Sequence, residues 1–190
     1  MSRSICVFCA SSKRVDGVYR DAIEDLARRM AERGDVLVYG GTNVGLMGVL
    51  AETMRLAGGR VVGIIPRFMV DHGIADEACD ELLTVDDMRV RKTLMEQRAD
   101  AFITMPGGFG TLEEFYELLA LKQLDQHRKP IVLVNTLGFY DALLGFHEQL
   151  YAQQFARTAY RDNFAVVADP GEALSYLDNY TPTSTASKWR

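Results

Sequence analysis

The segment AFITMPGGFGTLEE, residues 101–114, decides the fold, because a buried strand, a glycine-rich turn and the start of a helix follow one another within it. Residues 101–105 form an apolar run typical of a buried strand, and the pattern of residues 112–124 predicts a helix. The three glycines between them let the backbone approach a ligand closely, and amides at a helix start can point at an anion. Glu113 and Glu114 add two carboxylates to the first turn. The segment therefore predicts a site with both an anion cradle and acid chemistry.

Apolar runs alternate with helix-period segments along the rest of the chain. Continuous apolar runs separated by helices are typical of a parallel sheet covered on both faces. The predicted strands span residues 5–9, 36–39, 60–65, 81–85, 101–105, 131–134 and 164–167. The predicted helices span residues 19–33, 46–57, 88–99, 112–124, 139–153 and 171–177, and residues 66–80 are expected to form a loop. The pattern predicts an α/β fold, a single Rossmann-like doubly wound parallel sheet, over residues 1–178, with a flexible tail at 179–190. Its ligand site is expected beyond the carboxyl ends of the strands.

Size and charge limit the possible functions. A chain of 190 residues with 48% hydrophobic content suffices for one domain with a full core. No apolar run approaches the roughly 20 residues that span a bilayer, and the N-terminus lacks a signal-peptide pattern, so we expect a cytoplasmic protein without membrane contact. A net charge of −5 argues against nucleic-acid binding, which needs a basic face.

Cys6 and Cys9 form a C-x-x-C pair, which raises the question of redox or metal chemistry. A redox pair usually caps a helix, whereas these two lie on and at the end of the first predicted strand. Structural thiols in a reducing compartment are the favoured interpretation, and no metal is expected.

A second glycine-rich turn, GGTNVGLMG at residues 40–48, follows the strand that ends at Tyr39. Its spacing fits neither the dinucleotide fingerprint nor the P-loop. Taken alone, it is better explained as a tight strand-to-helix turn.

Arg91 shares a predicted helical stripe with Met88, Met95 and Ala99. A cation on an apolar stripe needs an anionic partner or a wet cavity. The alternative is a surface arginine whose stem covers apolar neighbours. Lys92 turns away from the stripe and is the weaker candidate.

Thr111 and Glu114 stand as T-x-x-E, which permits a purely structural explanation. In a capping box, Glu114 would tie back the helix start and Glu113 would be a solvated carboxylate favoured by the helix dipole. Capping explains none of the three glycines, however, so a ligand site is favoured over a cap.

Three segments together resemble the LOG family of cytokinin riboside 5′-monophosphate phosphoribohydrolases, long mislabelled as lysine decarboxylases. They are VYGG with GLMG within residues 38–48, Arg91-Lys92, and PGGFGTLEE at residues 106–114. The likeness covers residues 5–177. It implies hydrolysis of the N-glycosidic bond of a nucleoside 5′-monophosphate, AMP or an N6-substituted AMP, to free base and ribose 5-phosphate. It implies no cofactor, and a homodimer with its active site near the subunit contact.

By the family pattern, Arg91 and Glu114 are catalytic, and Gly108, Gly110 and Thr111 hold the phosphate. The residues that the resemblance assigns to substrate binding are Gly40, Gly41, Lys92, Gly107, Gly108, Phe109, Gly110, Thr111, Leu112 and Glu113.

The sequence departs from plant members at two places associated with substrate binding. Asp71-His72-Gly73 stands where they carry Pro-Arg-Glu, and Ala120-Leu121 stands where Thr-Trp is usual. Asp71, His72 and Glu77 are candidates to replace the missing carboxylate.

A different function stays open beside hydrolysis. Proteins of similar fold carry nucleotides or the molybdenum cofactor without catalysis, and the same glycine loops suit a carrier or sensor. A carrier has no need for Glu114 beside Arg91, so that pair distinguishes the two functions.

Overall fold

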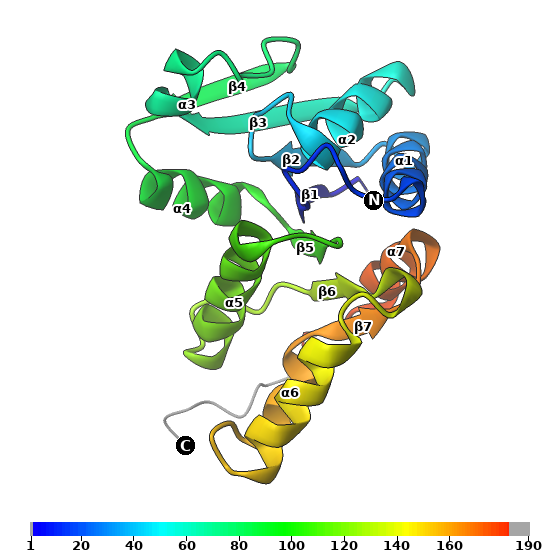
Figure 1. Cartoon of the computed structure of the whole chain (residues 1–190), viewed down its shortest axis with the longest axis vertical. Helices are drawn as coiled ribbons and strands as arrows, with labels where there is room; N and C mark the ends of the chain where they lie inside the picture. The colour runs from blue at the N-terminus through cyan, green and yellow to red at the C-terminus, as the bar shows by residue number, and fades with distance from the viewer. Residues whose placement is uncertain (1, 183–190) are drawn as a thin grey trace.

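The computed structural model describes residues 2–182, which build one seven-stranded parallel sheet (Figure 1). The strand order is β4-β3-β2-β1-β5-β6-β7, and every pairing in it is parallel. The strands are β1 Ser4–Phe8, β2 Val36–Tyr39, β3 Arg60–Pro66, β4 Glu81–Val85, β5 Ala101–Thr104, β6 Ile131–Val134 and β7 Ala165–Val167. The predicted α/β fold with a parallel sheet is confirmed.

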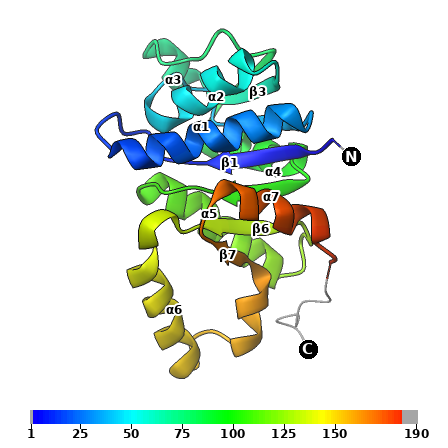
Figure 2. The ribbon, with the colours of Figure 1, turned by 90° about the vertical axis from the view of Figure 1, so that its right-hand side faces the viewer.

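Helices cover both faces of this sheet. The α-helices are α1 Gly17–Glu32, α2 Gly45–Leu56, α3 Arg67–Asp71, α4 Met88–Arg98, α5 Phe109–Gln123, α6 Asp141–Ala152 and α7 Pro170–Asn179. Helices α1, α2 and α7 pack on one face, and α4, α5 and α6 contribute to the core on the other. In Figure 2, α1 and α7 lie in front of the sheet.

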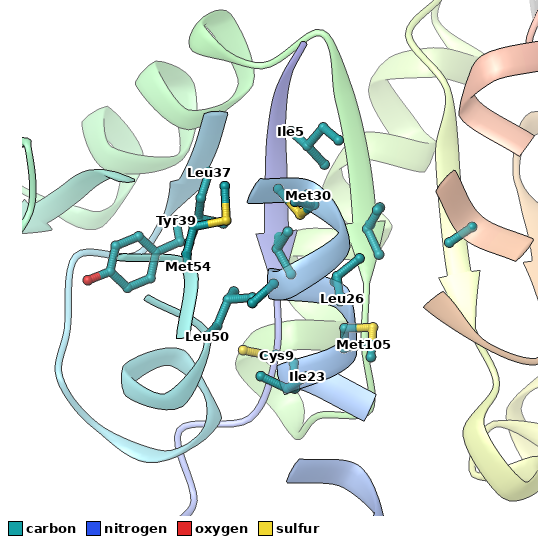
Figure 3. Close-up of a cluster of buried hydrophobic side chains, with 14 of the residues drawn as sticks. Ile5, Cys9, Ile23, Leu26, Met30, Leu37, Tyr39, Leu50, Met54 and Met105 are labelled. Atoms are coloured by element: carbon teal, nitrogen blue, oxygen red, sulfur yellow. The ribbon is translucent and has the colours of Figure 1, made fainter. Parts of the chain in front are cut away.

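Alternate residues of each strand feed two separate cores. Ile5 and Val7 of β1 point to the face covered by α1, whereas Cys6 and Phe8 point to the face covered by α4 and α5. Figure 3 shows the first core, in which Ile5 and Leu37 of the strands meet side chains of α1 and α2. Burial on both faces explains why the strands are continuous apolar runs in the sequence.

The β1–β5 border is where the chain reverses its direction across the sheet. The strand that follows β1 in the chain lies on one side of it, and β5 lies on the other. Connections that leave the carboxyl ends of these two strands diverge to opposite faces, which opens a crevice between them. The glycine-rich turn after β5 lies at this crevice.

Helix α5 begins three residues earlier than the sequence pattern predicted. Its N-cap is Gly108, which has no side chain to cap the first-turn amides, and Phe109 is its first residue. Thr111 is therefore already inside the helix, and the capping-box interpretation of Thr111 and Glu114 is wrong. The glycines before Phe109 allow the helix to begin there, so Glu114 lies in the second turn of α5.

Short helices were missed in regions where neither a strand nor a helix was predicted. They are α3 within the loop after β3, and the 3-10 helices Thr136–Gly138 and Thr158–Asn163. The tail expected at 179–190 lies outside the described residues from 183 onward. Tyr180 belongs to the predicted tail and is among the described residues. Its hydroxyl donates a hydrogen bond to the carbonyl of Arg128 at 2.8 Å and so fastens the end of α7.

Candidate functional site

A cavity of about 380 Å³ opens at the carboxyl ends of β1, β2 and β5, and the start of α5 forms one of its walls. Five residues of α5, together with its N-cap, line it. They are Gly108, Phe109, Gly110, Thr111, Glu113 and Glu114. Because Gly108 leaves the first-turn amides without a side-chain cap, this wall offers hydrogen-bond donors and the positive end of a helix dipole to an anion.

Arg91 enters the cavity from α4, whose start fixes its position. Asp87 caps that helix by accepting from the amides of Arg89 and Val90, and Arg91 follows one turn into the helix. Arg91 is only 5% exposed. Its Nε donates to the carbonyl of Ile64 at 3.1 Å and its Nη2 to that of Gly40 at 3.2 Å. Two of its nitrogens are thereby held by carbonyls, and Nη1 lies 3.7 Å from Sδ of Met88, which also lines the cavity.

Glu114 lies opposite this nitrogen, with Oε1 3.6 Å from Nη1 of Arg91. Its side chain is only 12% exposed. Burial raises the pKa of Glu114 to about 7, against the opposing effect of Arg91. A buried carboxyl that titrates near neutrality beside a fixed cation is typical of a functional site.

Two glycines provide the space that this arrangement needs. A methyl group on Gly40 would lie 1.8 Å from Nη2 of Arg91, and one on Gly107 would lie 2.2 Å from the hydroxyl oxygen of Thr111. Gly40 and Gly107 do not line the cavity, but they allow Arg91 and Thr111 to do so.

Three other residues assigned by the family pattern lie outside the lining. Gly41 has a φ of +70° and accepts the amide of Asp76 at 2.9 Å, which fastens a neighbouring loop. Leu112 packs against the core beneath α4 and α5. Lys92 bonds to carboxylates of α5 and does not face the main cavity.

The opposite wall is apolar, and sequence reasoning missed most of it. Met47, Met69, Ile74 and Met88 line it. Only Met88 carried a signal, as a neighbour of Arg91 on one helical stripe. The others come from the start of α2 and from the loop after β3, and only the folded chain brings them together.

That loop holds the three candidates for a replacement carboxylate, but it lines the cavity with apolar side chains instead. Asp71, His72 and Glu77 are exposed and do not line the cavity. The loop is held by the 3.1 Å hydrogen bond from the amide of Asn43 to the carbonyl of Ile74, and by Asp76, which accepts the hydroxyl of Tyr39 at 2.7 Å.

A larger groove of about 520 Å³ lies between the starts of α1 and α2. Its lining includes Asn43, Gly45, Leu46 and Gly48 of the second glycine-rich turn, but none of the residues predicted to be catalytic or substrate-binding. Its least exposed charged side chains, Arg55 and Asp76, pair with each other at 2.7 Å. The smaller cavity, with Arg91 and Glu114, is the better candidate site because its buried charges face the open space.

Residues 47–177 match the protein-family model described as "Possible lysine decarboxylase". The chain is 41% identical over 180 residues to cytokinin riboside 5′-monophosphate phosphoribohydrolase LOG2 of Arabidopsis thaliana, covering 95% of this chain and 84% of that protein. It is 39% identical over 191 residues to LOG5 of the same plant, covering 98% and 84%. The chain belongs to the LOG family.

Solved structures resemble this LOG-family fold at lower identity. The molybdenum cofactor carrier protein of Chlamydomonas reinhardtii aligns with a TM-score of 0.70 at 19% identity, covering 94% of this chain and 97% of that one. The molybdenum cofactor binding protein of Rippkaea orientalis aligns with a TM-score of 0.68 at 21% identity, covering 94% and 96%. At such identities the likeness shows the shared fold alone.

Within residues 2–182, no helix combines the length and apolar character needed to span a membrane. The same residues contain no group of three or more His, Cys, Asp or Glu side chains arranged to hold a metal ion.

Proposed function

We propose that this LOG-family protein hydrolyses the N-glycosidic bond of a nucleoside 5′-monophosphate, either AMP or an N6-substituted, cytokinin-type AMP. The products are the free base and ribose 5-phosphate. The observation that carries the proposal is the buried pair of Arg91 and Glu114 facing a cavity whose wall is the uncapped start of α5. The names of the LOG relatives support the same reaction.

Each part of the cavity has a chemical task in this reaction. The first-turn amides of α5, with Thr111, bind the 5′-phosphate and thereby fix the sugar. As the bond from C1′ to the base nitrogen breaks, its electron pair leaves with the base and the ribose becomes oxocarbenium-like. The Glu114 carboxylate stabilises that positive charge and orients the water whose oxygen bonds to C1′. One proton of that water is released, and the leaving base gains one. Arg91 holds the substrate.

The competing carrier function is less supported. A carrier needs the glycines and the anion cradle, but it gains nothing from a buried carboxyl with a pKa of about 7 in the cavity wall. Lysine decarboxylation is also poorly supported, because a pyridoxal phosphate Schiff base needs a lysine amine and none lines the described cavity.

Incubation with AMP and with isopentenyl-AMP, followed by chromatography of the released base, tests the proposed reaction. We expect base release from at least one of them, and at least 100-fold slower release from the matching nucleoside, because the phosphate anchor is missing. Saturable nucleotide binding without release from either nucleotide would favour the carrier function.

Gly40→Ala is expected to lower turnover by about 10- to 100-fold, because the added methyl group displaces the guanidinium of Arg91. Steady-state kinetics and a thermal melt measure the effect. Gly145→Ala in α6 is the matched control, since a methyl group there meets no atom within 4 Å. Equal activity of the two variants would mean that turnover does not depend on the position of the Arg91 guanidinium against Gly40.

We also propose that the protein is a homodimer whose subunit contact lies near the site. Phe109, at the rim of the cavity, is 93% exposed, and Val90 on α4 is 42% exposed. Apolar side chains left open beside a site are typical of a surface that a partner covers. Size-exclusion chromatography with light scattering measures the mass in solution, and we expect the mass of two chains.

A cytoplasmic location is proposed from the state of the cysteines. Cys6, Cys9 and Cys79 are all free thiols, and such thiols persist in a reducing compartment.

A further inference from the structure

A cluster of three charged side chains joins α4 to α5 next to Glu114, and nothing in the reaction proposed above uses it. The ammonium of Lys92 hydrogen-bonds to the carboxylate of Glu113 and lies 3.0 Å from Oε2 of Glu117. We call Lys92, Glu113 and Glu117 the Lys92 cluster. The Lys92 side chain is 16% exposed, whereas those of Glu113 and Glu117 are 53% and 41% exposed, so the cation is the enclosed member.

Glu114 lies between Lys92 and the main cavity. A second cavity of only about 50 Å³ is lined by Lys92 and Glu117 and also by Glu114, which lines the main cavity as well. Lys92 does not line the main cavity, and its ammonium already serves two carboxylates. Lys92 is therefore placed to influence the charge of Glu114, and it does not contact a ligand in the main cavity.

The charged and titratable groups that face Glu114 come from three elements. Arg91 and Lys92 lower the pKa of Glu114, while Glu113 and Glu117 raise it. Cys6 lies on β1 and Cys9 directly follows it, and the pKa values of both thiols are raised by burial and, secondly, by Glu114, so they stay neutral. The charges around Glu114 are thus two cations of α4, two carboxylates of its own helix and Glu96 of α4, which lines the small cavity with it.

We propose that Glu117 is a positioning residue for this site: it holds the Lys92 ammonium beside Glu114 and, with it, sets the charge around that carboxyl. The inference rests on the proposed hydrolysis, in which Glu114 acts as a carboxylate. In that role, activity falls as the pH is lowered and Glu114 takes up a proton. The midpoint of this acid-side loss reports the protonation of Glu114.

Two substitutions that break the same contact separate electrostatics from simple bracing of the helices. Lys92→Met removes a positive charge, so the acid-side midpoint is expected to rise by about half a pH unit. Glu117→Gln removes a negative charge, so the midpoint is expected to fall by about the same amount. Because the two charges offset each other, the double variant is expected to lie between the single ones, near the parent protein. A bracing role predicts instead equal losses of kcat with an unmoved midpoint.

A matched control and a second readout complete the test. Glu24→Gln makes the same chemical change in an exposed cluster with Arg20 and Arg28 on α1, and it should leave the profile unchanged. The carboxyl ¹³C resonance of Glu114, assigned by its loss in Glu114→Gln, gives the midpoint without any turnover. Midpoints that move in the same direction, or not at all, by this readout overturn the inference. Opposite shifts in a protein that releases no base would overturn the proposed hydrolysis and leave the role of Glu117 intact.

Discussion

Glu114→Gln is expected to lower turnover by about 10²- to 10⁴-fold and, at the same time, to stabilise the protein at pH 8. The loss follows because an amide cannot supply the negative charge that the ribose needs in the transition state. The gain follows from burial, since the side chain is 12% exposed and the pKa of Glu114 is raised to about 7 from an ordinary value of 4.5. The variant would thus exchange activity for stability.

The direction of the pH effect is fixed by that raised pKa. Below pH 4.5 both the folded and the unfolded protein carry a protonated Glu114, so its ionisation does not affect folding. Between pH 4.5 and 7 the unfolded chain ionises first, and the folded protein loses stability as the pH rises. The free energy of unfolding falls in total by about 3 kcal/mol, and the glutamine variant does not lose this stability because its side chain does not ionise.

Urea unfolding followed by circular dichroism at pH 4 and pH 8 measures this difference. The variant and the parent should be nearly equal at pH 4, and the variant should be the more stable at pH 8. Glu52→Gln, at an exposed position of α2, should change the free energy of unfolding by less than about 0.5 kcal/mol at either pH. If the Glu114→Gln variant kept its turnover, Glu114 would have no role in the chemical step.

Arg91→Lys has the second-largest expected effect, although the substitution keeps the charge. The guanidinium reaches the carbonyls of Ile64 and Gly40 and the carboxyl of Glu114 from three different nitrogens. A single ammonium cannot match that fork. At least one buried carbonyl loses its donor, which destabilises the fold by about 1–3 kcal/mol. We expect turnover to fall by about 100-fold or more, because the cation no longer stands where the substrate is held.

Steady-state kinetics of Arg91→Lys beside Arg89→Lys tests this expectation. Arg89 lies on the same helix but is exposed, so its substitution should be neutral. A change confined to KM, with kcat retained, would limit Arg91 to binding the ground state of the substrate.

The fold was predictable because its strands are buried on both faces. The bounds of β2, β4 and β6 match the predicted ranges. Helix α3 was not predictable, since its five residues are too few to show a helical repeat. The start of α5 was misplaced because T-x-x-E is a strong capping signal, whereas the backbone used the freedom of Gly108 to begin earlier.

The candidate site was predictable only where a short motif carries it. The PGGFGTLEE segment and Arg91 lie where the sequence indicated, at one end of the sheet. The apolar wall was not predictable, because Met47, Met69 and Ile74 are ordinary side chains until the loop after β3 folds over the cavity. The position of Lys92 behind Glu114 likewise depends on how α4 and α5 pack.

The way this loop is fastened has a consequence for how the cavity can change. Its attachments are hydrogen bonds of the main chain at Gly41 and Ile74 and of the buried carboxylate of Asp76, and none of them uses a side chain that lines the cavity. The side chain at position 69 can therefore be exchanged without loosening the loop or disturbing Arg91 and Glu114. The lining of the cavity can thus change while the positions of Arg91 and Glu114 stay the same. Exchanging that side chain is therefore a direct way to change the shape of the cavity.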